Sequence, residues 1–443
     1  MQAGFAKLDV TPPLQEPLQG YFTERFAKNI LDPLFLHALA LREGDETVLL
    51  IATDLQCVMT DVCSEIRERV SARTGVPKEK VLFAVLHIHT SLVLGDWEWT
   101  VTTPCTDTAY TDLLYRKCCD AAQMAIDDLS DATLYLGERE TAEPISFVRR
   151  YMMKNGTVKC NPGFKHQSEI AHPMGNADNT VRIARFAREG KNDIALVNFA
   201  THPDVIGGQR YSADWPGFAR RYVEKYLPDV SCILVNGCQG DVNHIDFLGW
   251  KGGLDTREAR YGHSEKMGRI IADAVRDEWK TLKRAQTGAL FAAAEDVFVA
   301  YNTQGIERYD EAKALYEGFK NGTAGEKNEN GMTLPEAKRI YNMHTRHGTI
   351  YRPVPVSVIA LGRFALVGIG GEPFTPYMER LRAAFPDRFL MTACCANGYA
   401  GYLPTKQAFA EGSYEVSNSI FVDSLEDEVV SAAVGLLQSA EEK

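Results

Sequence analysis

The sequence predicts an α/β protein with mixed β-sheets flanked by α-helices, because short β-rich runs alternate with segments of helical periodicity. Four apolar runs are typical of largely buried strands and span residues 48–55, 81–89, 193–200 and 231–237. Helix-compatible spacing is found at residues 60–74 and 107–129 and after His263. Further strands are expected near residues 289–301, 356–361 and 389–393, before a closing helix from about Leu425. Both halves of the chain therefore have an α/β pattern.

The composition is that of an ordinary globular protein with ample material for a large core. Of the 443 residues, 45% are hydrophobic and 24% are charged. Length alone also allows two or three domains, but strand and helix alternate without an internal repeat. We therefore expect a single domain over residues 1–443, with a surface loop at 318–330.

The net charge, the first residues and the cysteines indicate which partners and which compartment to expect. The net charge is −11 and Lys and Arg do not cluster, which argues against a nucleic-acid partner. The first residues lack a basic segment followed by an apolar run, so we expect a cytoplasmic protein. No stretch approaches the roughly 20 apolar residues of a membrane span, which argues against stable membrane association. The ten cysteines form no Cys-x-x-Cys pair, so reduced thiols are expected and a thiolate zinc site is not. The sequence leaves the oligomeric state open.

Two histidines close an apolar run. In LHIHT, His87 and His89 are two residues apart, and strand alternation would direct both side chains to the same face. One strand end can supply two metal ligands in this way. The same pattern also fits two hydrogen-bonded histidines at a pocket rim.

Three further candidates follow other predicted strands. His202 ends the apolar run in NFATHP, Glu372 follows two glycines in GIGGEPFTP, and Tyr402 lies in ANGYAGYLPT. Each also has an ordinary structural interpretation. The histidine could be structural, the glutamate could stabilise a helix start near residue 376, and the tyrosine could be a packed aromatic.

Six motifs together resemble a known family. KLDVTPP, HIHTS, NFATHP, NGCQGDVN, GGEPFTP and NGYAGYLPTKQAFAEGSYEV occur in the order found in the amino-terminal catalytic domain of neutral, non-lysosomal ceramidases. The similarity spans almost the whole chain. The resemblance implies one zinc ion per chain, with these ligands: His87, His89, His202, Glu372 and Tyr402.

The donor set agrees with this implication. Imidazole and carboxylate ligands suit Zn²⁺ and leave room for a water, whose pKa zinc lowers to about 7. By the same resemblance Tyr414 matches a catalytic tyrosine and Arg149 an active-site arginine. A surface-charge role for Arg149 and its neighbour Arg150 is the alternative.

The chain also departs from the ceramidase pattern. The family's catalytic serine in Gly-Asp-Val-Ser-Pro-Asn is Asn243 here, which cannot act as a nucleophile but could donate a hydrogen bond to an oxyanion. The Ser-Gly-Pro after the histidine pair is also replaced, and Trp97 and Trp99 follow, as a possible aromatic wall for a ligand or as packing. We also expect no immunoglobulin-like carboxyl-terminal domain.

Three more residues are expected around the site. Asp54 could orient a ligand histidine or hydrogen-bond a helix start or turn. Asp241, in the altered loop, is assigned with Asp54 to the surroundings of the metal ligands. His244, in the same loop, could shuttle protons or bind substrate, or make a plain hydrogen bond.

The sequence therefore predicts a metal-dependent hydrolase that uses zinc-activated water on an amide (N-acyl) bond of a soluble small molecule. In this hypothesis Tyr414 and Asn243 stabilise the oxyanion and Arg149 binds or polarises the substrate. An ester, lactone or cyclic amide is the alternative bond. A ligand-binding homologue that lost catalysis with the serine is the alternative class.

Overall fold

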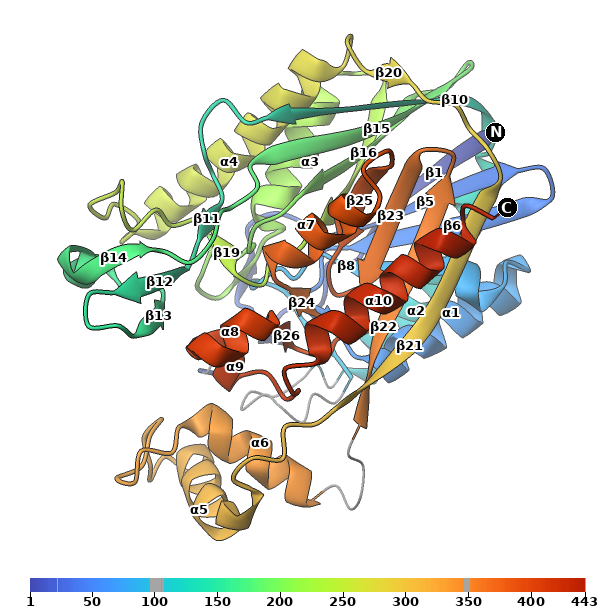
Figure 1. Cartoon of the computed structure of the whole chain (residues 1–443). Coiled ribbons are helices and arrows are strands. Elements are labelled where there is room, and N and C mark those ends of the chain that lie inside the picture. The colour runs from blue at the N-terminus through green and yellow to red at the C-terminus, as the bar shows by residue number, and fades with distance from the viewer. Residues whose placement is uncertain (22, 96–104, 106, 346–350, 443) are drawn as a thin grey trace.

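Two β-sheets pack face to face at the centre of the protein, and helices cover the outer face of each sheet (Figure 1). The computed structural model describes residues 1–21, 23–95, 105, 107–345 and 351–442. The expected α/β class with mixed sheets and flanking helices is confirmed.

The larger sheet has nine strands and mixed direction. The pairs β6–β8 and β16–β18 are parallel, and the other neighbours are antiparallel. In spatial order the strands are β18 (Val230–Asn236), β16 (Asp193–Phe199), β15 (Thr180–Arg188), β10 (Ser130–Glu140), β1 (Gln2–Asp9), β5 (Phe35–Glu43), β6 (Glu46–Thr53) and β8 (Val81–Val85), with β20 (Lys283–Arg284) paired to β10.

The smaller sheet has four strands, and its last pair is parallel. Its strands in spatial order are β21 (Leu290–Ala300), β22 (Tyr351–Leu361), β23 (Phe364–Ile369) and β25 (Phe389–Ala393).

Strand alternation explains why the strands are apolar on both faces. On β6, Leu49 and Ile51 face the helices that cover the larger sheet, whereas Val48 and Leu50 face the smaller sheet. A strand buried on both sides requires a nearly continuous apolar run, which is what the sequence shows. Each fully buried aliphatic side chain contributes about 1.5–3 kcal/mol to folding.

Helices cover both outer faces and form one separate pair. Apolar residues of α1 (Thr60–Thr74), α2 (Thr108–Asp127), α3 (Asp214–Tyr226) and α4 (Arg257–Glu278) pack on the larger sheet. Those of α7 (Thr375–Ala384) and α10 (Leu425–Ser439) pack on the smaller sheet. Helices α5 (Tyr309–Lys320) and α6 (Leu334–Thr345) share a small core of their own and lie beside the rest of the protein (Figure 1). None of the described helices is long and apolar enough to cross a membrane.

Short strand pairs and two short helices complete the fold and shape the region of the strand ends. The pairs are β2 (Pro17–Leu18) with β3 (Arg25–Phe26), β4 (Asn29–Ile30) with β17 (Arg210–Tyr211), β7 (Cys57–Val58) with β9 (Val93–Leu94), β11 (Phe147–Val148) with β19 (Val242–Asn243), and β24 (Glu372–Pro373) with β26 (Tyr402–Leu403). Strands β12 (Arg150–Met153), β13 (Val158–Cys160) and β14 (Ile170–Pro173) form a small sheet, and the short helices are α8 (Lys406–Glu411) and α9 (Tyr414–Ser417).

One strand boundary differs from the prediction. The run 81–89 was expected to be a strand through His89, but β8 ends at Val85. His87 has a φ of 67°, which strand pairing does not permit. The irregular backbone after β8, and not strand alternation, therefore sets the positions of the two histidine side chains.

Candidate metal centre

The candidate ligands follow strands of both sheets. His87 and His89 follow β8, and His202 follows β16 of the larger sheet. Glu372 follows β23 and Tyr402 follows β25 of the smaller sheet. Carboxyl ends of strands from the two sheets thus contribute to one site, and β24 and β26 place Glu372 directly opposite Tyr402.

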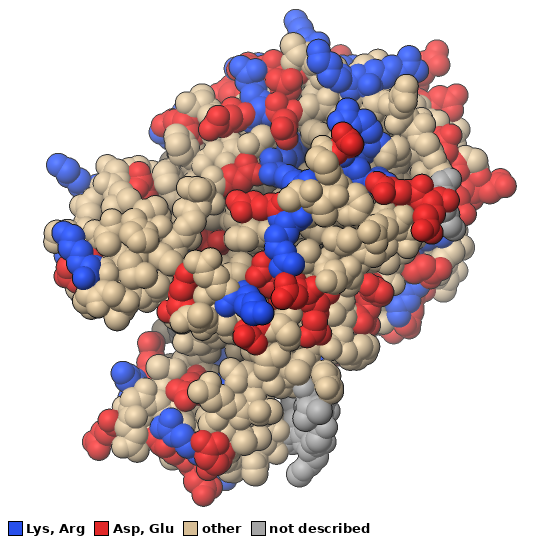
Figure 2. Space-filling model, in the orientation of Figure 1, with Lys and Arg blue, Asp and Glu red and all other residues tan. Residues whose placement is uncertain are grey.

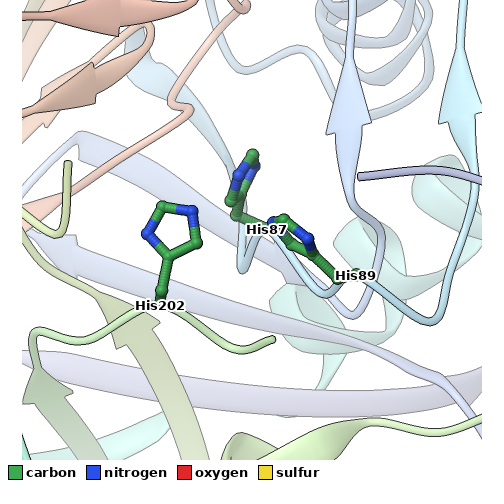
Figure 3. A group of neighbouring side chains, drawn as sticks. All are labelled: His87, His89 and His202. Atoms are coloured by element: carbon green, nitrogen blue, oxygen red, sulfur yellow. The ribbon is translucent and has the colours of Figure 1, made fainter. Parts of the chain in front are cut away.

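Three buried imidazoles converge at this point (Figure 3). His87, His89 and His202 can each offer a ligand atom, and these atoms lie within 4.8 Å of one another. Their ring centroids are 5.0–5.3 Å apart, and the residues are 1%, 7% and 1% exposed. No other such group of His, Cys, Asp and Glu side chains occurs among the residues that the structure describes.

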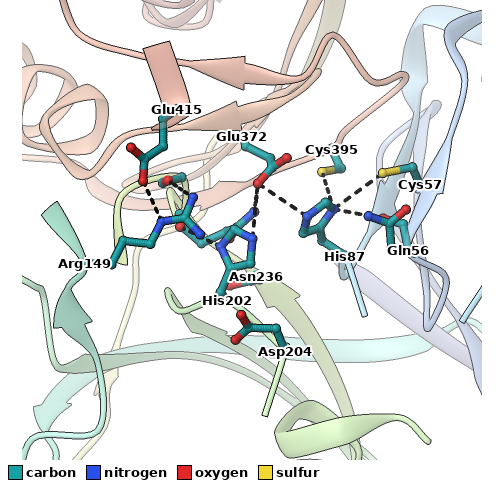
Figure 4. Close-up of polar contacts among 12 residues, drawn as sticks. Gln56, Cys57, His87, Arg149, His202, Asp204, Asn236, Glu372, Cys395 and Glu415 are labelled. Carbon is teal, nitrogen blue, oxygen red and sulfur yellow. Dashed lines mark hydrogen bonds and ion pairs between the residues drawn. The ribbon is translucent and has the colours of Figure 1, made fainter. Parts of the chain in front are cut away.

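Hydrogen bonds fix which ring nitrogens face the centre. The Nδ1 atoms of His87 and His202 lie 3.1 Å from the carbonyl oxygens of Gln56 and Gln239, respectively. This leaves both Nε2 atoms to face Glu372, whose Oε2 is 3.3 Å from each (Figure 4). Backbone carbonyls commonly orient metal-ligating histidines in this way.

Unpartnered nitrogens support a metal at this position. Neither ring nitrogen of His89 has a hydrogen-bond partner among the described residues, although both are buried. A buried polar atom without a partner costs about 1–3 kcal/mol, so a missing ligand is the physical explanation. Imidazole nitrogens with a carboxylate oxygen are a suitable donor set for zinc. The residues therefore fit a metal ion, but they do not determine its identity.

Glu372 is held as an anion. Burial raises the pKa of its carboxyl group, but the charges of His87 and His202 lower it more, so the pKa lies well below its ordinary value. The hydroxyl group of Tyr399 donates to Oε1, and the Gln239 Nε2 donates to Oε2 over 3.3 Å. Glu372 therefore presents a carboxylate oriented by four side chains.

The three histidines differ in charge preference. Burial and the neighbouring imidazoles hold the pKa of His89 well below 6.5. Burial and then Arg149 lower the pKa of His202 to about 3. Burial lowers the pKa of His87 too, but Glu372 raises it more, so the pKa of His87 lies well above 6.5. Two imidazoles are thus neutral and ready to bind a metal, and the third must lose a proton.

Arg149 lies against the candidate phenolic ligand. Its guanidinium carbon is 5.2 Å from the ring centre of Tyr402, which stacks on His202 at 6.5 Å. Tyr414 meets Tyr402 edge to face at 5.8 Å. Burial raises the pKa of Tyr402 well above 10, and the charge of Arg149 opposes this rise only in part, so the phenol keeps its proton until a metal ion displaces it. The arrangement brings the predicted Arg149, Tyr402 and Tyr414 together.

The surface-charge interpretation of the arginine pair is wrong. Arg149 and Arg150 are 3% and 2% exposed, because Glu415 lies between them. Its Oε1 is 2.9 Å from Arg149 Nε and its Oε2 is 3.2 Å from Arg150 Nη1. Arg150 also pairs with Glu411, whereas only Arg149 reaches Tyr402.

The loop that departs from the ceramidase pattern is buried. Asn243 donates to Asn161 Oδ1 over 2.8 Å and accepts from the backbone of Ile245. Asp241 accepts from the backbone and hydroxyl of Thr375, at the start of α7, and burial raises its pKa to about 6. Asp241 therefore anchors the segment that follows Glu372.

In space, one residue, Asp204, separates His244 from the candidate metal ligands. Its Nδ1 is 3.1 Å from Asp204 Oδ1. Burial raises the pKa of Asp204, but His244, His202 and His89 lower it more, so it remains an anion. His244 therefore faces the candidate centre through Asp204.

Asp54 has a different partner from the one expected. Its two carboxylate oxygens lie 2.8 and 2.6 Å from Arg220 Nη2, and one also accepts from the backbone of Phe35. The Gln56 carbonyl, and not Asp54, meets Nδ1 of His87. The expected pocket residues Trp97 and Trp99 lie outside the described residues.

Sequence reasoning missed five residues of this network: Gln56, Gln239, Tyr399, Asp204 and Glu415. Three lie within three residues of a predicted ligand or active-site tyrosine, in HPD, GYAGY and SYE. That proximity was an available signal. Gln239 contributes through its backbone carbonyl, which accepts from His202, and through its side-chain amide, which donates to Glu372.

The fold resembles that of neutral ceramidases. The crystal structure of neutral ceramidase from Pseudomonas aeruginosa matches with a TM-score of 0.73 at 15% identity, over 100% of this chain and 74% of that chain. A structure described as ceramidase complexed with C2 matches with a TM-score of 0.72 at 15% identity, over 100% and 75%. No protein-family model and no curated protein matches the chain.

The structural similarity confirms the predicted resemblance at the level of fold. An identity of 15% does not carry activity or substrate from the ceramidases to this chain. The single domain over residues 1–443 and the absence of an immunoglobulin-like domain stay predictions.

Proposed function

We propose that the protein is a zinc-dependent hydrolase that cleaves an amide (N-acyl) bond of a small molecule. The observation that carries the proposal is the buried His87, His89 and His202 group, with its unpartnered nitrogens, beside the Glu372 carboxylate. A bound zinc ion supplies a water nucleophile at neutral pH and polarises the carbonyl oxygen. The ceramidase-like fold raises the prior for hydrolysis.

The chain's own residues have distinct parts in this proposal. The negative charge of Glu372 balances positive charge at the histidines. Tyr402, on the opposite strand, completes the set of ligands. Arg149 is already committed to Gly240 and Glu415, so its main part is to favour the phenolate of Tyr402. Tyr414 packs edge to face on Tyr402, and in this proposal its hydroxyl donates to the oxyanion.

Asn243 has a narrower part than the family serine. One N–H of its amide is used by Asn161, and a primary amide has two. The second can serve an oxyanion, but no side-chain nucleophile is available at this position. The proposed reaction therefore depends on activated water alone.

A substrate panel tests the proposal. Purified zinc-loaded protein is incubated with matched N-acyl amines, esters and lactones, and rates are compared with those of His89→Ala. We expect hydrolysis of N-acyl amines that is lost in the variant. Preference for esters or lactones would change the bond assignment. Ligand binding without turnover of any class would favour the binding homologue and contradict the proposal.

A further inference from the structure

A pocket of about 190 Å³ lies outside the candidate metal centre, and none of the proposed metal ligands lines it. Arg210 of β17 and Arg257 and Arg260 of α4 line it, together with Gly207, Gly208 and Thr256. The one acidic residue that lines it is Asp255. The pocket therefore has an excess of positive charge in a chain whose net charge is −11.

The arginines are available to a ligand. Among the described residues, no carboxylate forms an ion pair with any of the three. The only hydrogen bond that their side chains make there is from Arg260 Nε to the carbonyl of Leu254, at 2.9 Å. Most other arginines of the described residues have a carboxylate or carbonyl partner, as Arg149 and Arg220 do. Figure 2 shows Lys and Arg mostly interspersed with Asp and Glu over the face of the molecule in view.

Two glycines form part of the pocket wall beside the arginines. A Cβ on Gly207 would lie 3.2 Å from Arg260 Nη1, and a Cβ on Gly208 would lie 3.7 Å from Arg257 Nε. Gly208 also has a φ of +90°, a conformation that favours glycine. The guanidinium groups can thus lie close to bare backbone. The amino terminus of the 22-residue helix α4 adds a favourable dipole for an anion.

One guanidinium connects the pocket with the metal centre. Arg25 Nη1 donates to the Gly208 carbonyl over 2.9 Å, and Arg25 Nη2 donates to the His89 carbonyl over 2.8 Å. Tyr21 bridges the same two regions, because its ring is 5.5 Å from the ring of His89 and its hydroxyl is 4.0 Å from the Cβ position of Gly207. The pocket wall and a candidate ligand are therefore neighbours.

We propose that this pocket is an anion subsite that binds a carboxylate or phosphate group of the substrate while the acyl bond lies at the metal centre. The position of the acyl bond at the metal centre rests on the proposed function. It defines the substrate class as N-acyl compounds that carry an anionic group. Arginine suits both anions, because its fork of N–H donors matches their oxygens.

Direct binding tests the subsite without catalysis. Inorganic phosphate and glutarate are titrated into the zinc-loaded protein, followed by calorimetry. Arg210→Gln with Arg257→Gln should weaken binding about tenfold or more, since charge-assisted hydrogen bonds are lost. Arg269→Gln is the matched control, because Arg269 is exposed on α4 and does not line the pocket. Thermal unfolding checks that the variants fold.

Two comparisons separate failure of the subsite from failure of the proposed function. His89→Ala should still bind the anions, because the pocket contains none of the metal ligands. In hydrolysis, N-acetyl amines that end in a carboxylate or a phosphate are compared with the same amines as neutral methyl amides. We expect a higher kcat/KM for an anionic partner, and a ratio that falls in the double variant; the preferred anion identifies the source.

Either of two results would overturn the subsite. One is equal anion binding by wild type and the double variant. The other is hydrolysis of neutral and anionic amides with the same kcat/KM. Anion binding without hydrolysis of any amide would instead support the pocket and contradict the proposed function.

Discussion

At the scale of single residues, His87 and Glu372 form the charge balance of the metal centre. Their Nε2 and Oε2 atoms are 3.3 Å apart and both side chains are buried; burial lowers the pKa of His87, but the Glu372 carboxylate raises it more, which favours a proton on His87. Zinc requires the neutral imidazole, so binding must displace that proton. The pKa of His87 lies above 6.5, so metal affinity should rise with pH as this proton is lost.

Calorimetry measures this proton. Zinc is titrated at pH 6 in two buffers of different ionisation enthalpy, and we expect release of about two protons per ion bound, one from His87 and one from the phenol of Tyr402. His89 and His202 add none, because their pKa values are lowered. Zinc binding without proton release, and with an affinity that does not change with pH, would contradict this charge assignment.

Glu415 is the second residue whose charge is decisive. It is fully buried between Arg149 and Arg150, so Glu415→Ala leaves two buried guanidinium groups without their shared partner. We expect a loss of about 3–5 kcal/mol in the free energy of unfolding, measured with urea. Glu411→Ala is the control, because Glu411 is 17% exposed and pairs only with Arg150. Equal losses of unfolding free energy in the two variants would contradict a special stabilising role for the bridge of Glu415 to the two arginines.

At the scale of elements, sequence patterns predicted several helices and strands of the two sheets but missed others, among them β1, β5, β10, β15 and α3, as well as the backbone at the ligands. Helix α1 and strand β25 have the expected bounds, because apolar periodicity and the turn residue Gly75 mark them. The segment after β8 was misassigned because Leu86 and Ile88 continue an apolar pattern. The φ of 67° at His87 has no signature in the side chains.

A glycine in the amino-terminal segment supports His89. Gly20 has a φ of +99°, and a Cβ there would lie 2.4 Å from His89 Nδ1. Gly175 has a similar φ of +107° with open space around it. Both Gly→Ala changes should cost on the order of 1–3 kcal/mol in unfolding free energy because of backbone strain.

Only Gly20→Ala should also weaken zinc binding, by about tenfold or more, because it displaces a ligand ring. Competition with a zinc-binding dye measures this affinity. Equal zinc affinity in Gly20→Ala and Gly175→Ala would contradict the contact between Gly20 and His89.

At the scale of the whole molecule, the site joins the two sheets. The histidines follow strands of the larger sheet, and Glu372 and Tyr402 follow strands of the smaller one. The sequence indicated an α/β class because local patterns determine it. It could not show that two sheets stack, because an apolar strand face fits a helix or a second sheet equally well.

A ligand that bridges both sheets should stabilise the fold as a unit. Zinc at 100 times its Kd should add about 2.7 kcal/mol to the free energy of unfolding, and a chelator should remove this gain. Scanning calorimetry with and without zinc measures it. Magnesium at the same concentration should add little, because it prefers oxygen ligands. Stabilisation by zinc that persists in His89→Ala would place the ion elsewhere.

The most direct test of the metal centre is elemental analysis of the purified protein and of His89→Ala. His172→Ala serves as the control, because His172 is exposed and far in sequence from the ligands. The His89→Ala variant should fold, because the His89 side chain makes no hydrogen bond within the described residues. We predict about one zinc ion per chain in wild type and control, and loss of zinc from His89→Ala. A chain that takes up no metal after zinc supplementation, or a His89→Ala variant with full zinc content, would contradict the account.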